Sequence, residues 1–148
     1  MSKILYTGFK GKNNSSCKLV EALQGEKCFL TNSFGGLKRD IDNVGGEYDA
    51  VYMFGLDKTL RDAVKIEMCA ELNTHIIRTA VDLSDVIDKF DKYGIKHIIS
   101  SYPTHYLCNE AYYHMLDKMN FNAVFFHIPT LKNLSENLHQ QLLQVFNS

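Results

Sequence analysis

The chain has no tryptophan, only 2 prolines and almost no net charge, since 16 lysines and arginines face 17 aspartates and glutamates. So little proline argues against a long disordered or low-complexity region. The balanced charge excludes a basic footprint for nucleic acid or an anionic membrane over the whole chain. No apolar run approaches the roughly 20 residues of a membrane-spanning helix. We therefore expect neither a nucleic acid nor a membrane as partner.

Metal, disulfide and cofactor motifs are also missing. The 4 cysteines form no CxxC pair, and the 6 histidines show no HxH or HxxxH spacing. No GxGxxG dinucleotide fingerprint occurs. The first residues lack the apolar segment of a secretory signal, so we expect a cytoplasmic protein with reduced thiols. The sequence predicts no metal and no cofactor.

Short apolar runs alternate with helical patterns along the 148 residues, and we expect one domain over 1–148. The expected strands are Lys3–Tyr6, Cys28–Leu30, Ala50–Phe54, Lys96–Ser100 and Ala123–Ile128. The expected helices are one capped by Ser16 and stopped at Gly25, one over 83–90 capped by Asp82 or Ser84, Tyr106–Met119, and a last one over 131–145. This alternation predicts an α/β fold, a three-layer α/β/α domain with a mostly parallel twisted sheet.

Two segments are less regular. The stretch between Gly35 and Gly46 is polar and bracketed by paired glycines, so we expect a loop with one helical turn. Apolar and polar residues alternate over Val64–Asn73, which favours one half-buried strand. A helix is the competing interpretation, because glutamate, methionine, alanine and leucine favour helices.

Three reactive side chains fall at expected strand ends or strand faces. Cys108 lies in the first turn of a helix, whose backbone amides stabilise a thiolate and lower a thiol pKa. His127 ends a strand, and Glu67 lies on the polar face of the alternating segment. Thiol, imidazole and carboxylate together form a Cys-His-acid arrangement for acyl transfer. Each has an ordinary alternative: a small buried thiol, a core histidine and a solvated carboxylate.

Several segments resemble the pyroglutamyl peptidase I (pyrrolidone-carboxylate peptidase) family of cysteine peptidases. Thr7-Gly8-Phe9 resembles that family's first strand end, and Ile66-Glu67 its segment with the catalytic acid. Tyr106-Leu107-Cys108-Asn109 is similar to its Tyr-Val-Cys-Asn nucleophile motif, and Phe126-His127-Ile128-Pro129 to its Phe-His-Val-Pro. The resemblance implies Cys108 as nucleophile, His127 as general base and acid, and Glu67 as the orienting carboxylate.

The substrate-binding segments depart from the family pattern. The family's glycine-rich segment is missing after Phe9, and Leu56 stands where a glutamine amide binds the pyroglutamyl ring. Arg78 lies one residue out of register with the family's active-site arginine, and His105 precedes Cys108 by three residues. The resemblance therefore implies a shortened, divergent member with Phe9, Leu56 and Arg78 at the substrate-binding positions. The position of His105 in the loop before Cys108 adds it as a substrate-binding candidate.

The predicted function is a thiol protease-like hydrolase that removes an N-terminal pyroglutamyl or related small acyl group from peptides, with a peptide or small amide as substrate. The alternative is a catalytically impaired homologue that serves as a small-molecule or protein binding module. A third, weaker interpretation is a doubly wound domain that binds a small anion at its helix N-termini. The oligomeric state is left open, a homo-oligomer included.

Overall fold

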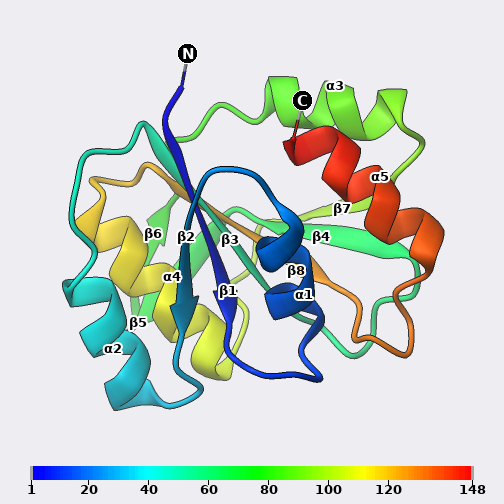
Figure 1. The fold of residues 1–148 in the computed structure, drawn as a ribbon. Coiled ribbons are helices and arrows are strands. Elements are labelled where there is room, and N and C mark those ends of the chain that lie inside the picture. Colours follow the sequence, from blue (N-terminus) through cyan, green and yellow to red (C-terminus); the bar gives the residue numbers. More distant parts are fainter. Residues whose placement is uncertain (1, 148) are drawn as a thin grey trace.

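A six-stranded sheet with the strand order β2-β1-β3-β8-β4-β7 organises the fold (Figure 1). The computed structural model describes residues 2–147, so the expected domain ends at 1 and 148 lie outside the described residues. The strands of this sheet are β1 (Ile4–Phe9), β2 (Glu26–Leu30), β3 (Ala50–Leu56), β4 (Ala63–Glu67), β7 (Lys96–Ser100) and β8 (Ala123–Ile128).

Four of the five neighbouring strand pairs are parallel, which confirms a mostly parallel sheet. The exception is the pair β4–β8, which is antiparallel. Because β7 runs parallel to β4, these two strands point opposite to the other four. The reversal lies next to β8, the strand that carries His127.

Helices cover both faces of the sheet, which confirms the three-layer α/β/α architecture (Figure 1). The helices α1 (Ser15–Ala22), α3 (Ser84–Lys92) and α5 (Glu136–Phe146) lie on one face, and α2 (Phe34–Asp42) and α4 (Tyr106–Lys118) on the other. Within residues 2–147, no helix is long and apolar enough to cross a membrane.

The helix starts differ in detail from those expected. Asn14, and not Ser16, caps α1, because its Oδ1 accepts hydrogen bonds from the backbone N–H groups of Ser16 and Cys17. Neither expected residue is the N-cap of α3, which is Leu83. Asp82 still accepts a hydrogen bond from the backbone N–H of Ser84 and so satisfies one free donor of that helix.

The expected loop between the paired glycines was wrong, because the nine-residue helix α2 occupies most of it. The Ser33 hydroxyl caps this helix by accepting a hydrogen bond from the backbone N–H of Gly36. A Cβ at Gly36 would lie only 2.6 Å from the side chains of Ser33 and Thr31. The glycine therefore permits a close approach at a helix start and does not mark a loop.

The expected single strand over Val64–Asn73 was also wrong, because it breaks at Met68. Its first half is β4 and its second half is β5 (Cys69–Leu72), which pairs with the unpredicted strand β6 (His75–Arg78) in a separate two-stranded sheet. Asn73 and Thr74 have positive φ angles of 51° and 67° and form the turn of this hairpin. The hairpin packs against α4 on one face of the main sheet.

Gly55 in β3 lies in close contact with the first turn of α4 and with the ring of Phe125 on β8. A Cβ at Gly55 would lie 2.6 Å from Cζ of Phe125 and 2.9 Å from Sγ of Cys108. Only a hydrogen atom fits there, so the ring of Phe125 and the start of α4 can both lie directly over the strand.

Gly55→Ala should destabilise the protein by about 1–3 kcal/mol, because its methyl group overlaps Phe125 and Cys108. Urea unfolding at neutral pH measures this change. Gly45→Ala is the matched control, since a Cβ there meets no atom within 4 Å, and it should change stability by less than about 0.5 kcal/mol. Equal stability of the two variants would contradict the close approach.

His139 on α5 should make stability depend on pH. The side chain is buried and, among the described residues, its Nδ1 has no hydrogen-bond partner. Burial, and next the charge of Lys18, lower the pKa of this imidazole below 6.5, against a smaller opposing effect of Glu136. The His139 imidazole of the unfolded chain is protonated near pH 6.5, whereas that of the folded chain is protonated only at lower pH. The free energy of unfolding therefore decreases as the pH falls through 6.5.

His139→Leu should therefore flatten the fall in unfolding free energy between about pH 7 and pH 5, as urea titrations at several pH values would show. His75→Leu, at an exposed position in β6, serves as control and should keep the wild-type slope. An unchanged slope in His139→Leu would contradict this origin of the pH dependence.

Candidate active site

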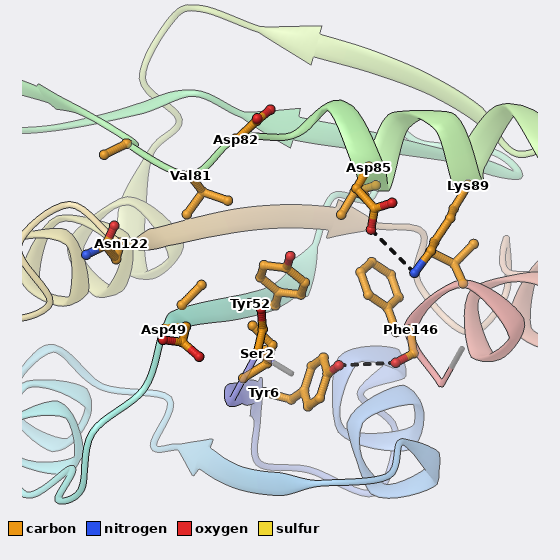
Figure 2. A pocket seen from close by; sticks show the side chains of 15 residues that line it. Ser2, Tyr6, Asp49, Tyr52, Val81, Asp82, Asp85, Lys89, Asn122 and Phe146 are labelled. Atoms are coloured by element: carbon orange, nitrogen blue, oxygen red, sulfur yellow. Dashed lines mark hydrogen bonds and ion pairs between the residues drawn. The ribbon is translucent and has the colours of Figure 1, made fainter.

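A cavity of about 510 Å³ lies at the edge of the sheet where β1, β3 and β8 begin (Figure 2). Tyr6, Tyr52 and Phe146 line it together with the ion pair between Asp85 and Lys89, whose charged atoms are 3.4 Å apart. No cysteine or histidine of the described chain lines this cavity. The reactive side chains instead gather at the opposite edge, where these strands end.

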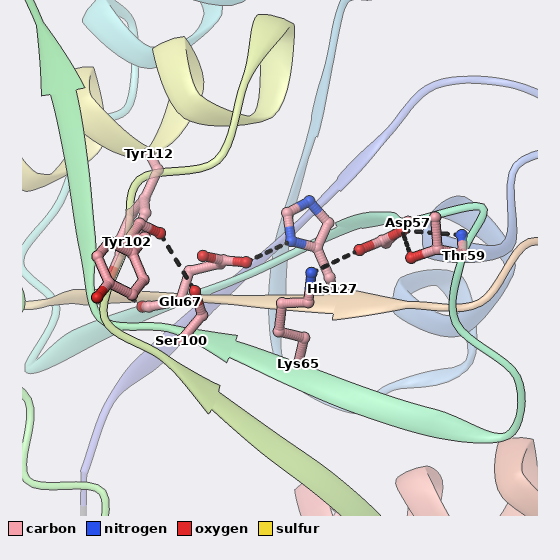
Figure 3. A network of polar contacts seen from close by, with 8 residues as sticks. All are labelled: Asp57, Thr59, Lys65, Glu67, Ser100, Tyr102, Tyr112 and His127. Carbon is pink, nitrogen blue, oxygen red and sulfur yellow. Dashed lines mark hydrogen bonds and ion pairs between the residues drawn. The ribbon is translucent and has the colours of Figure 1, made fainter.

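Glu67 and His127 form a buried hydrogen-bonded pair (Figure 3). The antiparallel register sets Glu67 opposite Phe125, two residues before His127 on β8, so both side chains lie on one face of the sheet. Nδ1 of His127 lies 3.2 Å from Oε1 of Glu67, and the two residues are only 3% and 1% exposed. When Nδ1–H donates to the carboxylate, Nε2 is left free to accept a proton.

The Glu67 segment is held by α4 as well as by β8. The hydroxyl of Tyr112 donates a hydrogen bond of 2.7 Å to the backbone carbonyl of Glu67 (Figure 3). Oε2 of Glu67 is buried without a hydrogen-bond partner in the described part of the chain. One carboxylate oxygen therefore orients the imidazole, while the other stays unpaired.

Cys108 lies in the first turn of α4, over Gly55, which is the register partner of His127 on β8. Burial raises the pKa of the Cys108 thiol to about 12, and the charges of Glu67 and Asp57 act in the same direction. A hydrogen bond with the backbone of Leu56 lowers it by less. The expectation that the helix N-terminus lowers this pKa was wrong, because desolvation outweighs the helix amides.

No hydrogen bond joins Cys108 to His127 within residues 2–147. At neutral pH the sulfur is therefore a buried thiol and not the thiolate of an ion pair with imidazolium. Catalytic hydrogen bonds are often long or absent before substrate binds, so this geometry leaves general-base chemistry open.

A cavity of about 150 Å³ adjoins the sulfur of Cys108, and two expected substrate-binding residues line it. Its walls are formed by Phe9, Asn14, Asn32, Leu56, Leu107 and Cys108. Asn14 uses its Oδ1 as the cap of α1, and Asn32 uses its Nδ2 to donate to the backbone carbonyl of Lys10. Nδ2 of Asn14 and Oδ1 of Asn32 have no hydrogen-bond partner in the described chain, so each side chain keeps one free polar atom.

The other two expected substrate-binding residues lie outside this cavity. Arg78 is exposed on β6, opposite Cys69, and its charge lowers the pKa of the Cys69 thiol against the larger effect of burial. His105 is exposed at the N-cap of α4, with its ring against Tyr106. Phe9 and Leu56 thus share this cavity with Cys108, while Arg78 and His105 do not line it.

Asp57 and Lys65 belong to the same polar network and were missed in the sequence (Figure 3). Each of them has a sequence feature that could have pointed to it. Asp57 stands two residues before Thr59, the spacing of an Asx-turn, and Lys65 shares the polar face of the alternating segment with Glu67. The break at Met68 also removes Cys69 from that face, and its buried thiol donates to the carbonyl of Ser101.

The described chain holds no group of three or more histidine, cysteine, aspartate or glutamate residues that could bind a metal ion.

No model of a known protein family matches the sequence, and no curated protein matches it. Solved structures do match. Pyroglutamyl peptidase I of Bacillus amyloliquefaciens is 16% identical with a TM-score of 0.81, covering 99% of this chain and 97% of that one. A mutant pyrrolidone carboxyl peptidase of Pyrococcus furiosus is 18% identical with a TM-score of 0.79, covering 97% and 93%. That of Thermus thermophilus is 19% identical with a TM-score of 0.76, covering 97% of each chain.

These likenesses confirm the fold that the resemblance implied. The similarity extends over nearly the whole of each chain, and identities of 16–19% establish a shared fold. This chain has the three-layer α/β/α fold of the pyrrolidone carboxyl peptidases.

Proposed function

We propose that this chain is a cysteine hydrolase of the pyroglutamyl peptidase type that removes an N-terminal pyroglutamyl or related small acyl group from peptides. The observation that carries the proposal is the buried hydrogen bond between Glu67 and His127 beside Cys108. Burying a carboxylate costs free energy. A buried Glu67 carboxylate that is hydrogen-bonded to His127, at the same edge of the sheet as the Cys108 thiol, therefore supports a catalytic role. The chain is then a shortened, divergent family member with a peptide substrate and an expected place in the cytoplasm.

The reaction assigns one step to each group. Sγ of Cys108 attacks the carbonyl carbon of the acyl group while Nε2 of His127 takes the thiol proton. The backbone N–H of Cys108 stabilises the resulting oxyanion, an effect often worth about 3 kcal/mol. The C–N bond then breaks as His127 returns the proton to the leaving amine. A water deprotonated by His127 hydrolyses the thioester, and Cys108 regains its proton.

The raised pKa of the Cys108 thiol decides between general-base catalysis by His127 and a preformed thiolate–imidazolium pair. Because burial keeps Cys108 protonated, His127 acts as a general base during attack and does not hold a preformed thiolate. Glu67 orients the ring through Nδ1 and stabilises the imidazolium that forms.

The cavity next to Cys108 supports a small, uncharged acyl group as substrate. Its volume of about 150 Å³ lies well below the roughly 300 Å³ at which sites for drug-sized ligands begin. Phe9 and Leu56 supply apolar walls, while the free amide atoms of Asn14 and Asn32 could pair with the C=O and N–H of a lactam ring. These two amides would take over the role of the family's ring-binding glutamine, since this chain has Leu56 at that position.

One observation favours the alternative of a binding module. A thiol with a pKa of about 12 and no hydrogen bond to His127 in the described structure is a poor resting nucleophile. A chain that kept the fold and the cavity but lost turnover would bind the small acyl group without cleaving it.

Hydrolysis of a pyroglutamyl fluorogenic amide, beside a panel of other N-terminal aminoacyl amides, tests the proposal. Cys108→Ala should abolish turnover because the covalent step is lost. His127→Ala and Glu67→Gln should lower kcat by about 10²–10⁴-fold, as removing a general base or its orienting carboxylate does.

Cys17→Ala is the matched control, since Cys17 lies on α1 with its thiol bonded to Glu21, and it should keep wild-type turnover. Unchanged turnover in Cys108→Ala would overturn the assignment. If the wild type cleaves no panel member yet binds the pyroglutamyl amide by calorimetry, the binding module replaces the enzyme.

A further inference from the structure

A half-buried ion pair lies on the far side of His127 from Glu67 (Figure 3). Nζ of Lys65 lies 2.9 Å from Oδ2 of Asp57, and the two side chains are 28% and 16% exposed. The other oxygen of Asp57 accepts hydrogen bonds from the backbone N–H and the hydroxyl of Thr59. Both carboxylate oxygens are therefore engaged, and these contacts hold the pKa of Asp57 at about 2 against the effect of burial.

The pair joins two strands that are not neighbours. Lys65 lies on β4 in register with His127, while Asp57 directly follows β3 on the other side of β8. The ion pair therefore crosses over β8 beside the imidazole (Figure 3). An ion pair between adjacent turns of one surface helix would not connect separate strands in this way.

Asp57 is also linked to the nucleophile. It follows Leu56, whose backbone forms the hydrogen bond with the sulfur of Cys108. The negative charge of Asp57 raises the pKa of the Cys108 thiol, and Lys65 places a positive charge 2.9 Å from that carboxylate. The charged groups facing the sulfur are thus Glu67 from β4 and Asp57 from the loop after β3, with Lys65 beside Asp57; His127 on β8 and His105 at the start of α4 are the nearby titratable rings.

We propose that Asp57 and Lys65 are positioning residues of the candidate active site, acting as a charge-balanced clasp over β8 that sets how readily Cys108 gives up its proton. The inference rests on the proposed role of Cys108 as nucleophile. Neither residue touches the reacting atoms. Lys65 neutralises Asp57, and Asp57 holds the turn that presents the Leu56 backbone to the sulfur.

The two partners must act on Cys108 with opposite sign. Without Lys65, the carboxylate of Asp57 is no longer balanced and disfavours the thiolate. Without the charge of Asp57, the ammonium of Lys65 is left unpaired and favours it. A purely structural role predicts a different result. Replacing either Lys65 or Asp57 would then loosen the site and expose the sulfur, so both replacements would change the reactivity of Cys108 in the same direction.

The rate of iodoacetamide labelling at Cys108 measures this directly, since only the thiolate reacts. Labelling of the full chain between about pH 7.5 and 9.5 is followed by mass spectrometry of the Cys108 peptide, with Cys17 of the same chain as internal reference. Lys65→Met should slow labelling and Asp57→Asn should speed it, each by up to about tenfold, the change that one pKa unit produces. The double variant should return to the wild-type rate.

Two further variants separate charge from folding. Lys65→Arg keeps the positive charge and should keep the wild-type rate. Lys38→Met breaks an exposed Lys–Asp pair of the same 2.9 Å length on α2 and should leave labelling unchanged. Changes of Lys65→Met and Asp57→Asn in the same direction, or a double variant further from wild type than either, would overturn the clasp.

The labelling needs no substrate, so its outcome is independent of the proposed hydrolysis. If no amide is cleaved but Lys65→Met and Asp57→Asn change the labelling rate in opposite directions, the hydrolase activity is overturned and the positioning role is supported. If amides are cleaved but both variants label like the wild type, the positioning role is overturned and the hydrolase activity is supported.

Discussion

The antiparallel pairing of β4 with β8 determines where Glu67 and Lys65 lie relative to His127. Had β4 run parallel to β8, as most neighbours in this sheet do, its register with His127 would have differed. Because it is reversed, Lys65 lies opposite His127 and Glu67 lies two residues away along β8 on the same face. One reversed strand thus gives the imidazole a carboxylate on one side and an ammonium on the other.

Burial sets the chemical character of this arrangement. His127 and Glu67 are almost completely withdrawn from solvent, and Cys108 is partly buried. In such surroundings a charge is stable only beside a partner, so the imidazole stays hydrogen-bonded and the sulfur keeps its proton. Under the proposed mechanism these surroundings favour proton transfer from Cys108 to His127 during attack over a preformed thiolate.

The sequence allowed the fold class to be predicted and Cys108, His127 and Glu67 to be named as candidate site residues, because both steps depend on local patterns. Buried strands such as β8 read as apolar runs, and Cys108 and His127 stand in motifs that resemble known ones. The reversal of β4 could not be read in this way, because strand direction follows from tertiary pairing and the alternating segment continues through the break at Met68. Its apolar and polar residues alternate equally well on either side of that break.

Helix α2 and the small cavity illustrate a second limit. The paired glycines that suggested a loop include Gly36, whose missing side chain admits Thr31 at the start of α2. Asn14 and Asn32 line one cavity with Cys108 because β1 and β2 end, and α1 begins, at one edge of the sheet. Packing of this kind depends on residues far apart in the chain, which no window of sequence contains.

The close approach at Gly55 has an evolutionary consequence. A lineage that adapted this scaffold to a new substrate would find position 55 closed, because any side chain there meets Phe125 and Cys108. The next position is open, since Leu56 at the end of β3 lines the cavity and is only partly buried. Diversification at this edge of the sheet is thus directed to the last residue of β3 and the loop after it, while position 55 beneath the thiol has no room to vary.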